Sequence, residues 1–264
     1  MSLFEIILLG IIQGFTEFFP VSSSGHLVLF QNLFGLRQPQ LLADIMLHVG
    51  TILSLLVFLR KELIELIQSF GRFCLSPIKN ISDPKIKLLF FLFLASLPIL
   101  FMGYFFQDIF ESLFGSLRGV GIALFITGGF LLLTKLAREK EKKNIFHIFL
   151  IGILQGIAIV PGLSRSGLTI GGALLLGWKK EEAARFSFLL SIPAILGAAL
   201  FHLKKMEAPS PSWPLLLIGI LVAAVFGFFA LTFLVRLINK GKFSSFSYYC
   251  FFAGSIAFLV SFFT

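Results

Sequence analysis

Two stretches of the sequence decide the fold: QGFTEFFPVSSSGH at residues 13–26 and QGIAIVPGLSRSG at residues 155–167. Each interrupts an otherwise apolar region, the first over residues 4–34 and the second over residues 145–178. In each region two short apolar runs flank a centre rich in Pro, Gly and Ser, and neither run reaches the roughly 20 residues that a membrane span needs. We therefore predict two re-entrant helix–loop–helix elements, because irregular backbone at membrane depth is tolerated only where protein or a wet cavity surrounds it.

The rest of the chain has the composition of a polytopic membrane protein. Only 13% of its 264 residues are charged, about half the fraction of an average soluble domain, and the mean hydropathy is +0.98. The expected spans are Leu41–Leu59, Ile86–Phe106, Leu117–Leu136, Phe186–Leu203, Trp213–Leu237 and Phe246–Phe263. The sequence thus predicts an all-α polytopic membrane protein, one membrane domain over residues 1–264, with six transmembrane helices and the two re-entrant elements.

The two interrupted regions also match each other in sequence. A shift of 142 residues aligns positions 4–25 with positions 146–167 without a gap and gives ten identities. Matches of Leu and Ile arise easily by chance between apolar segments, but Q-G and S-x-S-G in register do not. We interpret this as an internal repeat, with repeat 1 over about residues 1–140 and repeat 2 over about residues 141–264.

The repeat predicts an inverted topology. Each half holds one re-entrant element and three spans, and because three is odd, the second half starts on the opposite side of the membrane from the first. Seventeen Lys and Arg fall in the loops at residues 60–87, 135–143, 179–185 and 236–242, against four on the other side. The excess of positive charge makes the first set cytoplasmic. Both termini are then expected on the outer side.

The formal net charge of +9 is explained by this orientation rather than by nucleic-acid binding. No basic face interleaved with aromatic residues is present, so we expect no nucleic-acid partner. The two cysteines, Cys74 and Cys250, lie far apart and form no metal-binding or disulfide pattern.

Two charged residues stand out within the interrupted regions. A guanidinium at membrane depth costs about 2.5 kcal/mol or more, so Arg165 needs a reason to be there. Flanked by Ser164 and Ser166 and by glycines, it is typical of an anion-binding site made from hydroxyls, backbone N–H groups and a planar set of donors. Glu17 lies among aromatic residues, and it is either the neutralising partner of Arg165, a base, or a metal ligand.

A cluster of hydroxyls follows Glu17 in the first stretch. Ser22, Ser23 and Ser24 precede a helix, and one N-cap explains only one of them. His26 lies one helical turn after Ser23, close enough for a hydroxyl–imidazole pair. The remaining candidates for substrate contact are Gln13, one turn before Glu17, and Thr169, one turn after the second loop. No cluster of Cys and His and no P-loop is present, and a tetrahedral oxyanion suits this set of groups.

The two stretches resemble the signature motifs of the undecaprenyl-diphosphatase family, the bacitracin-resistance type of integral membrane phosphatase. QGFTEFFPVSSSGH is similar to that family's (E/Q)-x-x-x-E segment with its following Ser and His, and PGLSRSGLT to its PG-x-SRS-x-x-T segment. Motif order, spacing, chain length and number of spans agree as well, so the resemblance covers essentially the whole chain.

The resemblance implies hydrolysis of undecaprenyl diphosphate to the monophosphate in the bacterial inner membrane, which recycles the carrier lipid of peptidoglycan synthesis. It implies catalytic roles for Glu17, Ser23, His26 and Arg165. The implied supporting residues are Gln13, Ser22, Ser24, Ser164, Ser166 and Thr169. It also implies a divalent cation, magnesium or calcium, for which Glu17 is the candidate ligand, and a pocket open to the outer face.

The residues leave three routes open. Ser23 attacks with help from His26, His26 attacks directly, or His26 activates water, with Glu17 orienting His26 or holding a metal. A different class, a lipid-phosphate flippase or anion transporter, would use the same inverted repeats and broken helices. The Ser-x-x-His pair beside Glu17 favours the phosphatase, because a carrier needs binding groups but no nucleophile.

Overall fold

The computed structural model describes residues 1–264 except 37–39, 107–115, 141–142, 204–211 and 264. The described part is helical and contains no strand. Its helices are α1 (Leu3–Phe18), α2 (Ser23–Leu33), α3 (Leu41–Phe58), α4 (Arg60–Leu75), α5 (Pro77–Asn80), α6 (Pro84–Phe105), α8 (Leu117–Leu133), α9 (Ile145–Ile157), α10 (Arg165–Leu175), α11 (Lys180–Leu203), α12 (Trp213–Asn239) and α13 (Phe246–Val260). Short 3₁₀ turns, Thr134–Leu136 and Phe243–Ser245, follow α8 and precede α13.

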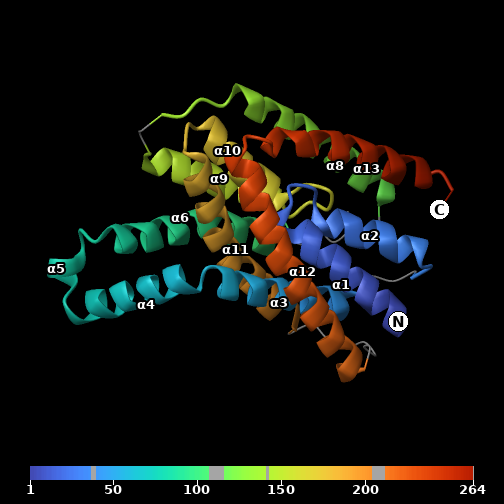
Figure 1. The fold of residues 1–264 in the computed structure, drawn as a ribbon, viewed down its shortest axis with the longest axis horizontal. Coiled ribbons are helices and arrows are strands. Elements are labelled where there is room, and N and C mark those ends of the chain that lie inside the picture. Colours follow the sequence, from blue (N-terminus) through green and yellow to red (C-terminus); the bar gives the residue numbers. More distant parts are fainter. Residues whose placement is uncertain (37–39, 107–115, 141–142, 204–211, 264) are drawn as a thin grey trace.

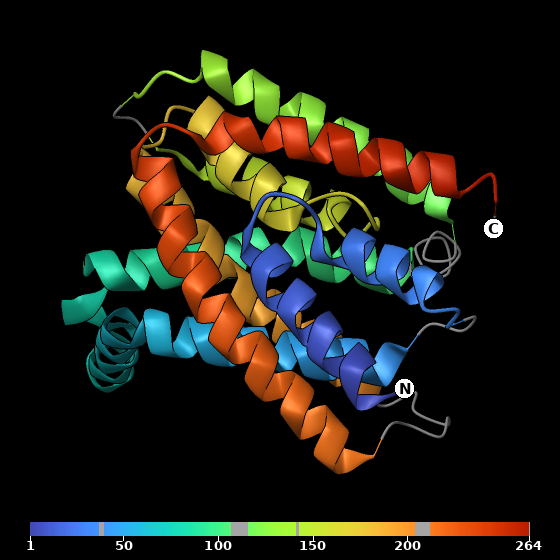
Figure 2. The same ribbon diagram turned by 45° about the vertical axis from the view of Figure 1, so that its right-hand side comes forward.

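The number of spans agrees with the prediction. Five helices of the described residues are long and apolar enough to cross a membrane, and a sixth span results if the bent pair α3 and α4 is counted as one. Many large apolar side chains on these helices are exposed, as expected for surfaces that face lipid. The protein is therefore a multi-pass membrane protein, and both described ends of the chain lie at the same end of the molecule (Figures 1 and 2).

The two interrupted regions each form a helix, a loop and a second helix, as predicted. Helices α1 and α2 join through residues 19–22, and α9 and α10 join through residues 158–164. With 16, 11, 13 and 11 residues, none of these helices reaches the length of a span. Figure 2 shows the two loops side by side in the middle of the bundle.

The prediction of a plain loop at residues 60–87 was wrong. Helices α4 and α5 and the start of α6 occupy this segment, and α4 is turned by 80° from α3. The reason is a helical period in its apolar residues: Leu66 is buried, while Ile67 and Phe70 are exposed on a neighbouring face. Helix α4 is thus amphipathic, and the pair Lys85 and Glu65 ties it to α6.

Small residues allow the helices around the loops to approach closely. α1 and α3 both pack on α12, and α9 packs on α6. A Cβ atom at Gly14 would lie 2.8 Å from the carbonyl oxygen of Ala223 in α12, and one at Gly152 would lie 2.6 Å from that of Ala95 in α6. Each interrupted region therefore packs on a long helix from the other half of the chain, while the exact repeat boundaries stay a prediction.

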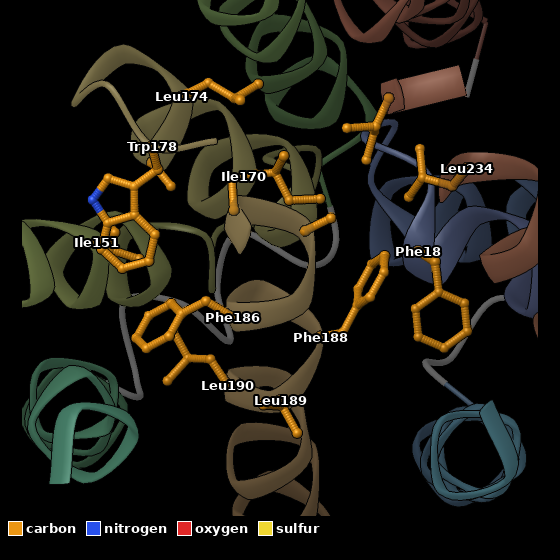
Figure 3. Close-up of a cluster of buried hydrophobic side chains, with 14 of the residues drawn as sticks. Phe18, Ile151, Ile170, Leu174, Trp178, Phe186, Phe188, Leu189, Leu190 and Leu234 are labelled. Carbon is orange, nitrogen blue, oxygen red and sulfur yellow. The ribbon is translucent and has the colours of Figure 1, made fainter. Parts of the chain in front are cut away.

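A cluster of buried hydrophobic residues packs next to the two loops. Phe18 of α1 meets Phe188 of α11 edge to face, with ring centroids 6.2 Å apart, and Trp178 meets Phe186 in the same way at 5.2 Å. Figure 3 shows these rings with Ile170 of α10 in one cluster. The cluster joins both interrupted elements to α11, so tight packing fixes the helices that carry the loops.

Candidate active site

Direct hydrogen bonds hold the two loops together. Ser22 Oγ accepts the N–H of Gly162 at 3.1 Å and that of Gly25 at 3.2 Å, so it caps α2 and reaches across to the second loop. In return, Ser166 Oγ donates to the carbonyl oxygen of Phe19 at 3.0 Å. The two stretches that were singled out in the sequence thus form one polar centre.

The backbone is strained where the loops meet. Among the described residues, Ser22 is the one non-glycine residue with a positive φ, at 67°. Gly162 has φ of 95°, and a Cβ atom there would lie 2.5 Å from the carbonyl oxygen of Val120. Backbone strain of this kind costs about 1–3 kcal/mol and is typical of functional sites.

Glu17 lies at the centre of the site. Its Oε1 accepts a hydrogen bond from Nη2 of Arg165 at 2.7 Å, across 148 positions of sequence. Its Oε2 accepts from Ser23 Oγ at 2.7 Å and from Nε2 of Gln13 at 2.9 Å. The side chains of Glu17 and Arg165 are only 4% and 15% exposed, so the carboxylate and the guanidinium neutralise each other away from water.

His26 has partners that the sequence did not suggest. Its Nδ1 lies 2.7 Å from the carbonyl oxygen of Ser22, and its Nε2 lies 2.7 Å from the hydroxyl of Tyr249, whose ring stacks on the imidazole. A carbonyl oxygen only accepts, so Nδ1 carries the proton and Nε2 accepts from the tyrosine. The expected pair between Ser23 and His26 is not formed, because the histidine side chain turns toward α13 and Ser23 turns toward Glu17.

The supporting hydroxyls bond mainly to the protein itself. Ser164 Oγ caps α10 by accepting the N–H of Gly167 at 3.1 Å and lies 3.2 Å from Ser166 Oγ. In the first loop, Ser24 Oγ lies 3.4 Å from Ser22 Oγ. Thr169 Oγ1 donates to the carbonyl oxygen of Arg165 at 2.8 Å. These contacts fix the loops, while direct substrate contact by these residues stays a prediction.

Two residues near the centre were missed in the sequence. Nε2 of His48, on α3, lies 3.4 Å from Oε2 of Glu17, and Tyr249 lies on His26. A third missed residue, Thr127 of α8, donates to the carbonyl oxygen of Gly162 at 3.1 Å. All three are polar residues on apolar helices, which is the signal that would have found them.

The fit of a divalent cation can be tested on the donor atoms present. Among the described residues, no three His, Cys, Asp or Glu side chains are placed to hold a metal ion. The buried Oε1 of Gln13, however, has no hydrogen-bond partner there, and it belongs to the amide that lies on Glu17. Oxygen ligands from Glu17 and Gln13, completed by substrate phosphate, suit a hard cation. Glu17 and Gln13 are therefore suitable ligands for a divalent cation.

The sequence is similar to one protein family along most of its length. The profile of the family described as bacitracin resistance protein BacA matches residues 6–256. A protein of Carboxydothermus hydrogenoformans is 41% identical over 266 residues, covering 96% of this chain and 95% of its own. A protein of Desulfatibacillum aliphaticivorans is 40% identical and covers 99% of this chain and 100% of its own.

A third relative, from Methanobrevibacter smithii, is 39% identical and covers 99% of this chain and 98% of its own. All three relatives carry the name undecaprenyl-diphosphatase. The match of the family profile spans both loops and every described helix from α2 to α12, and these relatives align along nearly their whole lengths. The chain belongs to the bacitracin resistance protein BacA family.

Proposed function

We propose that this protein is an integral membrane phosphatase that hydrolyses undecaprenyl diphosphate to undecaprenyl phosphate and phosphate. The observation that carries the proposal is the buried ion pair between Glu17 and Arg165, with Ser23 hydrogen-bonded to the same carboxylate. The pair joins the two loops, and it combines a phosphate-binding cation, a base and a hydroxyl in one place. The name shared by the relatives agrees with this chemistry.

Ser23 is the nucleophile in the mechanism that we favour, and Glu17 is its base. Ser23 Oγ forms a bond to the terminal phosphorus while its proton passes to Oε2 of Glu17, 2.7 Å away. The bond from that phosphorus to the bridging oxygen breaks, and undecaprenyl phosphate leaves. Glu17 passes that proton to the departing undecaprenyl phosphate. Water then attacks the phosphoserine, its proton passes to Oε2 of Glu17, and Ser23 Oγ takes up this proton as phosphate leaves.

Arg165 stabilises the charge on the transferring group. Among the described residues its guanidinium makes one side-chain hydrogen bond, to Glu17, and four further N–H donors belong to the same group. A donor that is already held in position costs no reorganisation when the transition state forms. A bound divalent cation would supply further charge neutralisation, with Glu17 and Gln13 as the residues that hold it.

His26 is not free to attack in this arrangement. Both ring nitrogens have partners, the carbonyl of Ser22 and the hydroxyl of Tyr249. The imidazole therefore supports the loop and the tyrosine hydroxyl, and its action as nucleophile or base would first require Tyr249 to move. This favours the route through Ser23 over the two routes that begin at His26.

The wider setting follows from the same proposal. The protein would lie in the bacterial inner membrane with both termini on the outer side, as the distribution of basic residues indicates. The polyprenyl tail would lie among membrane lipids against the exposed apolar side chains, and the product would return to peptidoglycan synthesis. The description of the family also associates it with bacitracin resistance, which this activity would confer.

Phosphate release from undecaprenyl diphosphate by the purified protein in detergent tests the proposal. The parent protein should turn over, and Ser23→Ala should lose about a thousandfold or more of the rate, as the loss of a nucleophile does elsewhere. The matched control is Ser255→Ala, because among the described residues Ser255 bonds only to the carbonyl of Phe251, on an exposed face of α13. A folded parent protein that releases no phosphate, with or without a divalent cation, would make transport the better hypothesis.

A further inference from the structure

The surroundings of Oε2 of Glu17 resemble the inner sphere of a metal site. Three side chains contact this one oxygen: Ser23 Oγ at 2.7 Å, the amide of Gln13 at 2.9 Å and Nε2 of His48 at 3.4 Å. Ligand atoms about 2.1 Å from a cation and at right angles to each other lie about 3 Å apart. Oε1 accepts from Arg165, so a cation would use one lone pair of Oε2 and leave the other to Ser23.

The hydrogen bond of His48 presents a lone pair to Glu17. Nδ1 lies 2.7 Å from the backbone carbonyl oxygen of Asp44, which can only accept, so Nδ1 carries the proton of the neutral ring. In this tautomer Nε2 faces a carboxylate oxygen with a lone pair, and either a second proton on the ring or a cation between the two atoms removes their repulsion. Metal-binding histidines are usually held in this way, with the other ring nitrogen donating to a carbonyl or carboxylate.

The backbone that carries His48 is itself fixed. The side chain of Asp44, one turn earlier on α3, accepts a hydrogen bond from Gln31 of α2 at 2.7 Å. This bond ties α3 to the helix that follows the first loop. The imidazole is therefore held by its own helix and by the loop region, as a ligand must be to keep its geometry.

The amide of Gln13 provides the third ligand. Its oxygen is buried and has no hydrogen-bond partner among the described residues, which is costly for a polar atom. The oxygen and nitrogen of a glutamine amide are nearly the same size, so a half turn of the amide brings Oε1 to the place of Nε2, 2.9 Å from Glu17. With a cation present, this turn gives the oxygen a partner, and Nε2 moves to the place that the oxygen leaves.

We infer that His48, which lies outside both sequence motifs, is a ligand of a divalent cation held together with Glu17 and Gln13. The inference rests on the proposed function, because phosphate oxygens and water would complete the coordination. His48 is 26% exposed on its side chain, so one side of the cation would remain open. Mn²⁺ accepts one imidazole among oxygen ligands more readily than Ca²⁺, which prefers oxygen alone.

Binding of Mn²⁺ to the purified, metal-free protein in detergent, without substrate, tests the inference. Electron paramagnetic resonance should show one bound Mn²⁺ per chain and a nitrogen coupling from a coordinated imidazole. His48→Gln should remove that nitrogen signal and weaken Mn²⁺ binding at least tenfold. One control should keep both the signal and the affinity: His147→Ala, whose imidazole lies by Trp178.

Two outcomes would overturn the inference: no Mn²⁺ bound by the parent protein, or an unchanged nitrogen signal in folded His48→Gln. Either result would leave the contact between His48 and Glu17 as an ion pair alone. Failure of the proposed function is recognised separately, because it appears as absent phosphate release by the parent protein. Should His48→Gln unfold, His48→Asn takes its place, since it keeps a donor for the carbonyl of Asp44 while losing the ligand atom.

Discussion

Removal of one partner of the buried ion pair should destabilise the protein strongly, and the two single variants should differ. Breaking a buried pair costs about 3–5 kcal/mol because it leaves an uncompensated charge. In Glu17→Ala, Arg165 loses the one side-chain hydrogen bond that the described structure gives it. In Arg165→Ala, Glu17 still accepts hydrogen bonds from Ser23 and Gln13, so this variant should lose less.

The double variant should cost less than the sum of the two single variants. With neither charge present, no unpaired ion remains in the site, and the coupling free energy should reach about 2 kcal/mol or more. The assay is reversible unfolding in mixed micelles, in which the fraction of denaturing detergent is raised and helix content is followed. Additivity of the two single variants within about 0.5 kcal/mol would refute the reasoning.

Three further predictions concern the loops and the helices that hold them. Ser22→Ala should cost about 2 kcal/mol or more in the same unfolding assay by leaving two N–H groups unpaired, and Ser22→Gly should cost less because glycine accepts the positive φ. Tyr249→Phe leaves the buried Nε2 of His26 without its donor and should cost about 1–3 kcal/mol in the same unfolding assay. Tyr248→Phe on the exposed face should cost little, and equal stability of the two variants would contradict a supporting role for the Tyr249 hydroxyl. Gly50→Ala should destabilise the protein by about 1–3 kcal/mol, because its Cβ atom would lie 2.4 Å from a carbonyl oxygen of α12. Gly71→Ala, whose Cβ atom would meet no atom within 4 Å, should stabilise α4 by about 0.5–1 kcal/mol, and a loss of stability in both variants would refute the packing argument.

Much of the fold could be predicted because membrane spans are a property of local composition. A run of about 20 apolar residues satisfies its backbone within one helix, so its position needs no knowledge of its neighbours. The interrupted regions could also be predicted, because Pro, Gly and Ser at residues 13–26 and 155–167 break apolar stretches that would otherwise form spans. Helix α4 was missed because its charges at Arg60 and Lys61 indicate a loop unless the helical period is also counted.

The site was predicted only in part, because contacts between distant segments leave little local signal. Glu17 and Arg165 were found since each is an isolated charge at membrane depth, and the structure pairs them. Proximity along one helix suggested that Ser23 and His26 would pair, but the side chains point to different neighbours. His48 belongs to neither sequence motif, and its contact with Glu17 depends on how α3 packs against α1.

Single-turnover phosphate release from undecaprenyl diphosphate, measured for the parent protein, Glu17→Gln and Arg165→Gln, tests most directly whether the two loops form one catalytic site. Glu17→Gln removes a charge with little change in volume, Arg165→Gln removes one and shortens the side chain, and folding is checked by helix content. We expect rapid release by the parent protein and a loss of about a hundredfold or more in each variant. Release by either folded variant at the rate of the parent protein would contradict a catalytic site shared between the two loops.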